Sequence, residues 1–116
     1  MEKNKMSTQL MYKPLPDSLT IKTSKVDGLG LFAKEGIGQG TNLGMCHLQI
    51  GDTIFRTPLG GFINHSGNGN CVKVELRMTD EDIKGHQYNY KKWNLIVSQD
   101  IKKGEELTVR YTFYKV

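Results

Sequence analysis

The stretch Gly61-Phe62-Ile63-Asn64-His65-Ser66, continued by Gly67-Asn68-Gly69-Asn70-Cys71, carries the most information about the fold of this 116-residue chain. An apolar pair leads into a dense cluster of polar residues, which ends where a strand pattern begins. On its own the cluster predicts an exposed loop, because Asn, Ser and Gly are turn-forming residues. His65 taken singly is more often a hydrogen-bonded structural histidine than a catalyst. No Ser-His-Asp or Cys-His arrangement lies next to it in the sequence.

Two further stretches flank this one. Val26-Asp27-Gly28-Leu29-Gly30-Leu31-Phe32-Ala33 places two glycines around one residue, which permits a tight turn and a close approach of a ligand to the backbone. It lacks the third glycine and the following helix of a dinucleotide-binding fingerprint, so we reject a Rossmann interpretation. The stretch from Ile101 to Tyr114 predicts a turn followed by a strand. Each stretch alone is ordinary, but their order and content together are not.

Apolar residues at every second position predict a mostly β fold of short strands. Val72, Val74 and Leu76 alternate with charged residues, as in a half-buried strand, and Trp93, Leu95 and Val97 repeat the pattern. Further strands are expected around Leu19–Ile21, Leu31–Phe32, Leu43–Met45, Ile54–Phe55 and, with one apolar face, at Leu107, Val109, Tyr111 and Phe113.

Helical signal is scarce. The best candidate is residues 79–84, where a threonine cap, acidic residues in the first turn and Gly85 as a stop predict a turn or two of helix. The stretch from Gly85 to Lys92 is interpreted as a polar loop or the end of a hairpin.

The composition predicts one globular domain. Hydrophobic residues make up 37% and charged residues 24% of the chain, and no apolar run is long enough to span a membrane. The first residues are basic without a following apolar stretch, which argues against a secretory signal. We expect an intracellular protein, in the cytoplasm or the nucleus.

Two cysteines, Cys46 and Cys71, are too few for a disulfide framework and form no C-x-x-C pair, so we expect no metal site. The formal net charge of +4 is a mild excess carried by dispersed residues, which does not by itself indicate a nucleic-acid partner. The one cluster of aromatic and basic residues that could serve such a partner is Tyr88 to Trp93.

Gly-x-Gly-Leu-Phe-Ala at 28–33, Phe-Ile-Asn-His-Ser at 62–66 and Gly-Glu-Glu-Leu-Thr-x-x-Tyr at 104–111 together resemble the SET domain of protein-lysine methyltransferases. The resemblance runs from about Leu15 to Tyr114, and the three motifs stand in family order. It implies a β-clip fold of several short sheets with a C-terminal pseudoknot. The expected domain is 15–116, preceded by an N-terminal arm at 1–14.

The resemblance also implies the site. The backbone around Gly28, Leu29 and Gly30 would hold the methionine part of S-adenosylmethionine, and Asn64 and His65 would bind its adenine and amino-acid ends. Tyr111 matches the catalytic tyrosine of the family, which also borders the cofactor. Phe113 and Tyr114 are candidates for lining the channel that admits the substrate lysine. The implied partner is a protein with a target lysine, such as a histone or a host protein; no nucleic acid or membrane is expected.

Several departures from the family pattern leave an alternative open. Gly67 and Gly69 replace a Cys and a Pro, and the segment from Gly44 to Gly60 is shorter than the family norm. No cysteine-rich lid follows Tyr114. A second copy of the chain could supply a missing wall, so homodimerisation is a hypothesis. The alternative function is a SET-fold protein-binding module with weak or no catalysis.

Overall fold

The computed structural model describes residues 14–110. Within this range the chain forms eight strands and one short helix. In chain order they are β1 (Leu19–Thr23), β2 (Leu29–Ala33), β3 (Asn42–Ile50), β4 (Thr53–Arg56), α2 (Pro58–Phe62), β5 (Asn64–His65), β6 (Cys71–Glu81), β7 (Gln87–Val97) and β8 (Glu106–Val109). The predicted mostly β class is confirmed, and each predicted strand is present as far as residue 109.

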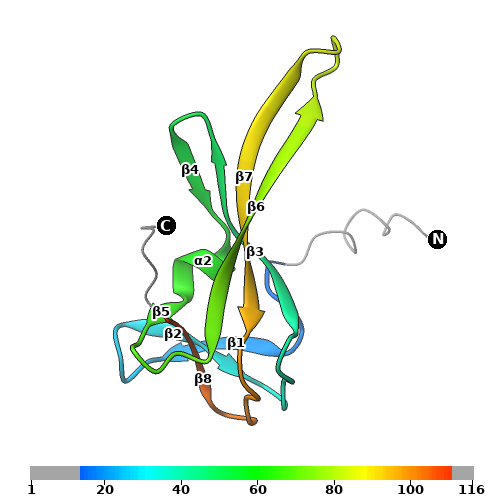
Figure 1. Cartoon of the computed structure of the whole chain (residues 1–116). Helices are drawn as coiled ribbons and strands as arrows, with labels where there is room; N and C mark the ends of the chain where they lie inside the picture. The colour runs from blue at the N-terminus through cyan, green and yellow to red at the C-terminus, as the bar shows by residue number, and fades with distance from the viewer. Residues whose placement is uncertain (1–13, 111–116) are drawn as a thin grey trace, which may run out of the picture.

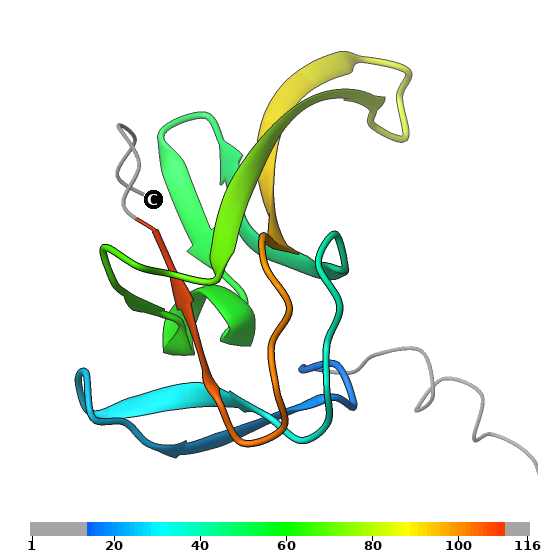
Figure 2. The same ribbon diagram turned by 60° about the horizontal axis from the view of Figure 1, so that its bottom comes forward.

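Strand β8 joins the two parts of the sheet, which are the β1–β2 hairpin and the set of strands β6, β7, β3 and β4. The strands follow the order β1-β2-β8-β6-β7-β3-β4, and β5 lies off this path beside β8. Strand β8 is antiparallel to β2 and parallel to both β5 and β6. The β1–β2 hairpin crosses the base of the molecule, while the β3–β4 and β6–β7 hairpins diverge at the other end (Figures 1 and 2). The first, second and third motifs are therefore brought to one strand.

The core lies between these two parts. Strand β7 contributes Trp93, Leu95 and Val97, and β8 contributes Leu107 and Val109, all at most 5% exposed. Their two-residue spacing places each set on one face of its strand, as the sequence pattern predicts. Further core side chains come from β1, β2, β3, α2 and the bridge between Ile37 and Ile101.

Strand β6 differs from the half-buried strand that the sequence predicts. Val74 and Leu76 are 41% and 37% exposed, whereas Cys71 is fully buried. The register pairs these two residues with Asn94 and Lys92, on the face of β7 that points away from the core. The apolar residues Val74 and Leu76 therefore lie on the outer face of the sheet, because the other face of β7 packs against the core.

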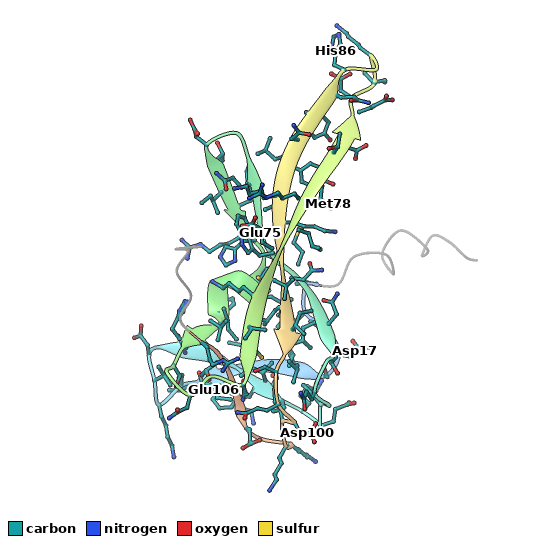
Figure 3. The ribbon with its side chains drawn as sticks, in the orientation of Figure 1. Asp17, Glu75, Met78, His86, Asp100 and Glu106 are labelled. Atoms are coloured by element: carbon teal, nitrogen blue, oxygen red, sulfur yellow. The ribbon has the colours of Figure 1, made fainter. Side chains whose placement is uncertain are left out.

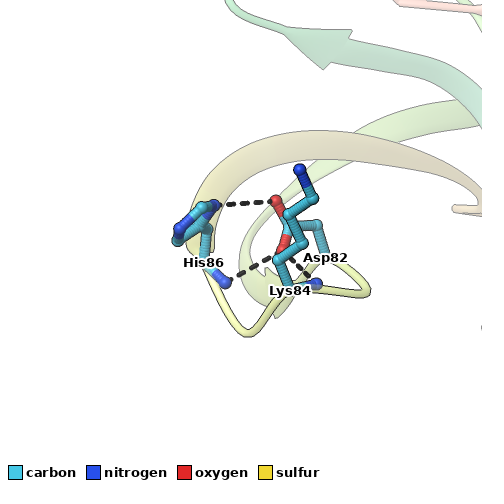
Figure 4. A network of polar contacts seen from close by, with 3 residues as sticks. All are labelled: Asp82, Lys84 and His86. Atoms are coloured by element: carbon cyan, nitrogen blue, oxygen red, sulfur yellow. Dashed lines mark hydrogen bonds and ion pairs between the residues drawn. The ribbon is translucent and has the colours of Figure 1, made fainter.

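The predicted helix at 79–84 is wrong. Residues 79–81 continue β6 and pair with Asn89, Tyr88 and Gln87. Asp82 then closes the turn: its Oδ1 accepts hydrogen bonds from the backbone N–H groups of Lys84 and His86, both at 2.9 Å (Figure 4). Gly85, expected as a helix stop, has a φ of +84° in this turn. The acidic residues that suggested a first helical turn thus belong to a hairpin, whose second strand begins within the expected loop at Gln87.

The one helix of the described chain was not predicted. Its N-cap, Thr57, accepts a hydrogen bond from the N–H of Gly60 and donates one to the carbonyl of Met45 at 2.7 Å. Pro58 follows as the first helical residue, a position that needs no N–H donor. A Cβ at Gly60 would collide with the carbonyl oxygen of Cys46, so the glycine lets α2 approach β3 closely. Five residues are too short to show a helical period in the sequence.

Candidate functional site

The three sequence motifs meet at a cluster of polar side chains, the junction of Ser24, Asn64 and Glu106. The carboxylate of Glu106 accepts hydrogen bonds from Ser24 Oγ at 2.8 Å and from Asn64 Nδ2 at 2.9 Å. Ser24 follows β1, Asn64 begins β5 and Glu106 begins β8 at the base of the molecule (Figure 3). The junction therefore ties together segments up to 82 residues apart in the chain.

Ser24 shapes the loop between β1 and β2. Its Oγ accepts hydrogen bonds from the backbone N–H groups of Val26 at 2.8 Å and of Asp27 at 3.3 Å. The same hydroxyl donates its one hydrogen toward Glu106. The loop that carries Gly28 is thus held by a hydroxyl whose orientation is set by the carboxylate.

Asn64 fastens the other side of this loop. Its Nδ2 lies within 3.2 Å of four acceptors, namely the carbonyls of Asp27 and Leu29, Ser24 Oγ and the Glu106 carboxylate. One NH₂ group has two hydrogens, so these acceptors share them. The side chain assigned to the cofactor from the sequence therefore also braces the glycine loop, and its direct contact with the cofactor stays a prediction.

The two glycines of the first motif differ in what surrounds them. A Cβ at Gly30 would collide with Oε2 of Glu106 and lie 3.0 Å from Asn64 Nδ2. A Cβ at Gly28 would meet nothing within 4 Å, although the φ of +43° there disfavours other residues. Gly30 makes room for the junction, whereas Gly28 leaves an open stretch of backbone next to it.

A second set of contacts holds β8 further along. Asn70 Oδ1 accepts a hydrogen bond from the N–H of Thr108, and its Nδ2 donates to the carbonyl of Glu106, both at 3.0 Å. Gly69 is buried, and a Cβ there would lie 2.6 Å from the Arg110 nitrogen. The amide of Asn70 thus acts as a short strand partner for β8. Residues 69–71 fix the course of the strand that leads to Tyr111.

The other predicted site residues are placed as follows. His65 pairs with Val109 in the parallel β5–β8 ladder, so it lies at the end of β8. Partial burial, and secondly the charge of Lys73, lower the pKa of His65. Leu29 is half exposed beside Gly28. Tyr111, Phe113 and Tyr114 lie outside the described residues, so their assignments stay predictions.

His47, to which the sequence assigned no role in the site, is buried beside this region. It is 1% exposed, and among the described residues its Nδ1 has no hydrogen-bond partner. Burial, followed by the charges of Lys73, Arg56 and His65, lowers its pKa to about 4. A register shift between Met45 and His47 lets two consecutive residues, Cys46 and His47, both turn inward. His47 is therefore neutral at pH 7.

We expect acid to destabilise the protein through His47. Between its ordinary pKa of 6.5 and about 4, the unfolded chain binds a proton that the folded protein does not. The free energy of unfolding should therefore fall as the pH drops through this window, by about 3 kcal/mol in total. The free energy of unfolding, measured by urea titration at several pH values from 4 to 7.5, should depend much less on pH in His47→Gln. The dependence that remains should come in part from His65.

Ile83→Gln, a change of a residue that does not titrate, at the exposed tip of the β6–β7 hairpin, is the control and should keep the wild-type dependence of stability on pH. An unchanged slope in His47→Gln would contradict the assignment of the acid sensitivity to His47.

Both cysteines are free and buried. Burial raises the pKa of Cys46 to about 11 and that of Cys71 to about 12, so neither thiol is a ready nucleophile at neutral pH. No group of three or more His, Cys, Asp or Glu side chains that could hold a metal ion occurs in residues 14–110. No helix in the same range is long and apolar enough to cross a membrane.

The cluster interpreted from the sequence as an aromatic and basic surface is divided in space. Trp93 is 5% exposed and belongs to the core. Tyr88, 40% exposed, shares with Lys92 the face of β7 opposite to Lys91, because successive side chains of a strand alternate. Tyr90 lies on the face of Tyr88, with the two ring centroids 5.8 Å apart, so the segment forms a two-ring patch beside Lys92 and not one continuous stacking platform.

The fold and the junction define a class of protein. It is a β domain in which β8 pairs with the Asn64–His65 segment on one side and with β2, which follows the glycine loop, on the other. The model of the SET domain family matches residues 51–112, just over half of the chain. The chain belongs to the SET domain family.

Solved structures agree on the fold, with 132 chains matching. One is the crystal structure of a Plasmodium falciparum protein described as a "putative histone methyltransferase". It is 17% identical, the match covers 85% of this chain and 96% of that one, and the TM-score is 0.61. No curated protein matches the chain.

Proposed function

We propose that the chain transfers a methyl group from S-adenosylmethionine to a lysine side-chain amine of a protein. The family is one of S-adenosylmethionine-dependent lysine methyltransferases. The observation that carries the proposal is the convergence of the three motifs at the Ser24–Asn64–Glu106 junction. Strands with a purely structural role would need neither glycine. Gly28 leaves its backbone uncovered, and the buried Gly30 leaves room for Glu106 and Asn64.

The residues around the junction fit the proposed cofactor. The backbone at Gly28 is open, and the carboxylate of Glu106 puts a negative charge behind the loop, which suits a ligand with cationic groups. We assign the backbone of Gly28, Leu29 and Gly30 to the methionine part, and Asn64 and His65 to the adenine and amino-acid ends. The bound cofactor supplies a methyl carbon on a sulfonium ion.

The chain's own task is to position the amine and to let it lose its proton. A lysine amine has an ordinary pKa of about 10.4, and removal from water lowers it. We assign Tyr111 to holding the amine in line with the methyl carbon, and Phe113 and Tyr114 to the walls of the lysine channel. In this scheme no separate general base is required.

The partners of this reaction are also part of the proposal. The substrate is an intracellular protein in the cytoplasm, or in the nucleus if it is a histone. A second copy of the chain would complete the channel wall. Light scattering coupled to gel filtration at assay concentration would exclude this role of a dimer if it found a monomer.

The direct test uses methyl-labelled S-adenosylmethionine with histones and with a cell lysate, alongside calorimetry of cofactor binding. Label in lysine would establish the activity. Cofactor binding without transfer would point to a missing substrate. Absence of both would reject the proposal in favour of the alternative, a SET-fold protein-binding module.

We expect Gly30→Ala to weaken the binding of S-adenosylmethionine by at least tenfold, about 1.4 kcal/mol. The added methyl group must displace Glu106 or Asn64, and both brace the loop that carries Gly28. Calorimetry measures the loss. Gly38→Ala is the control, because a Cβ there meets nothing within 4 Å. Equal affinities of the two variants would show that the junction does not support the cofactor loop.

A further inference from the structure

A groove opens between the two diverging hairpins. It lies between the β3–β4 hairpin, which contributes Gln49 and Gly51, and the β6–β7 hairpin, and it has a volume of about 500 Å³. Figure 1 shows how far the two hairpins separate at this end of the molecule. From the β6–β7 hairpin it is lined by Arg77, Thr79, Asn89 and Lys91, among others. We call this the basic groove.

The charges that line the basic groove are all positive. Arg77 and Lys91 are directly opposite each other in the β6–β7 ladder. Like charges in this position repel each other and destabilise a sheet. Glu75 relieves the repulsion in part, with its Oε2 3.2 Å from Arg77 Nε, but the Arg77 side chain remains 80% exposed. An anionic partner would remove the remaining repulsion.

The same face of the sheet carries further cations toward the junction. The register aligns Arg56, His47, Trp93 and Glu75 in one row across four strands, next to the row of Gln49, Lys91 and Arg77. Lys73 follows on β6, close enough to lower the pKa of His65 by its charge. In these rows the cations Arg56, Lys73, Arg77 and Lys91 therefore outnumber the one carboxylate, Glu75, which Figure 3 labels.

This face also leads to the end of β8. Cys71 pairs with Val109, the second residue before Tyr111 in the sequence. From Cys71 to Arg77 is six residues of extended strand, or about 20 Å. Cys71, Trp93 and His47 on this face are buried, so a bound peptide passes outside the elements that cover them. About 20 Å of extended peptide from the target lysine corresponds to six residues, which brings the sixth residue over the basic groove.

We propose that the basic groove docks an acidic segment of the protein substrate, centred about six residues from the lysine that is methylated. This rests on the proposed function for the lysine, and on the register and charges of β6 and β7 for the docking. The amide and hydroxyl groups of Gln49, Asn89 and Thr79 suit both carboxylates and an extended peptide backbone. A nucleic acid is disfavoured, because Trp93 is buried and Tyr90 is the one aromatic residue among those that line the groove, which is too few for a row of stacked bases.

Binding can be measured without methyl transfer. The probes are fluorescent 20-residue peptides with one central lysine. On each side of the lysine, a block of three residues is centred six positions away. In one peptide these blocks are all Glu, and in the other they are all Gln. Fluorescence anisotropy with the full chain at low salt should give about tenfold tighter binding of the Glu peptide. Added salt should reduce the difference.

Two charge reversals on neighbouring residues locate the effect. Lys91→Glu should remove most of the preference for the Glu peptide. Lys92→Glu makes the same change of charge on the other face of β7 and should leave the preference intact. Equal binding of the Glu and Gln peptides, or an equal loss in Lys92→Glu, would overturn the proposal. Displacement of the Glu peptide by a 12-nucleotide single strand at lower concentration than by unlabelled Glu peptide would also overturn it, in favour of a nucleic-acid surface.

The spacing is tested by methyl transfer to peptides whose acidic block lies two, six or ten residues from the lysine. We expect the lowest KM at six. Transfer that is independent of spacing would overturn the docking geometry while leaving the methyltransferase proposal intact. A preference for Glu in binding, without transfer to any peptide, would instead retain the docking site and count against the proposed function.

Discussion

Replacing Gly60 by alanine is expected to lower the free energy of unfolding by about 3 kcal/mol, since a methyl group forced into a packed interior costs 1–3 kcal/mol and at times more. The Cβ of an alanine at position 60 would collide with a backbone atom, the carbonyl oxygen of Cys46. It would also lie 2.9 Å from the ring of His47. A flexible side chain could move aside at low cost, but the backbone of β3 is held by β4 and β7 on its two edges. The strain must therefore separate α2 from the sheet.

The adjacent glycine provides the matched control. Gly61 lies in the same five-residue helix, is exposed, and has nothing within 4 Å of an added Cβ. Gly61→Ala should be neutral or stabilising by up to about 1 kcal/mol, because alanine is the better helix former. Urea unfolding of both variants at pH 7 measures the contrast. Equal stabilities would mean that α2 can shift away from β3 without loss, and the tight contact would not matter.

The sequence predicts burial correctly in strands whose apolar residues, at every second position, face the core. Trp93, Leu95 and Val97 face the core as their spacing indicates. The same pattern misleads at Val74 and Leu76, because which face of β6 is covered depends on its register with β7. Thr79 and the acidic run at 80–82 suggested a capped helix, because helix caps and hairpin turns use the same residue types. Such choices are made by tertiary pairing, which local patterns do not encode.

The candidate site was partly predictable. The three motifs were predicted to act together, and they meet at the junction. Ser24 was missed because one serine in a turn carries no signal of a carboxylate 82 residues away. Asn70 and Glu106 stood in the quoted motifs without a role, and only the folded chain reveals that they hold β8 and the glycine loop.

Gly69 bears on whether the chain is a weakened enzyme. From the sequence, the two glycines after Ser66 favoured a looser loop and a binding module. In the structure Gly69 is buried against Val109 and Arg110, where a Cβ would lie 2.7 Å or less from their backbone atoms. The glycine allows a closer approach of β8, so this departure from the family pattern does not by itself argue for lost catalysis. Gly67, with nothing within 4 Å, has no such contact.

Replacing Tyr111 by phenylalanine is expected to lower the rate of methyl transfer by about 100-fold, the order of loss that a misplaced reacting group causes. The change removes one hydroxyl and keeps the ring. If the phenol positions the lysine amine, kcat should carry the loss, whereas the affinity for S-adenosylmethionine should change by less than about threefold. Strand β8, which Asn70 and Gly69 hold up to Arg110, should keep its place, so the stability should be unaffected.

The same chemical change at Tyr88 is the control, because that ring is 40% exposed on the β6–β7 hairpin and lies far along the chain from the junction. Tyr88→Phe should transfer label at the wild-type rate. A wild-type rate in Tyr111→Phe would remove the tyrosine from the reaction and leave the resemblance without its catalytic residue. A loss of cofactor binding as large as the loss of rate would move its role from the amine to the cofactor, since an interaction made equally before and during transfer changes affinity and not kcat.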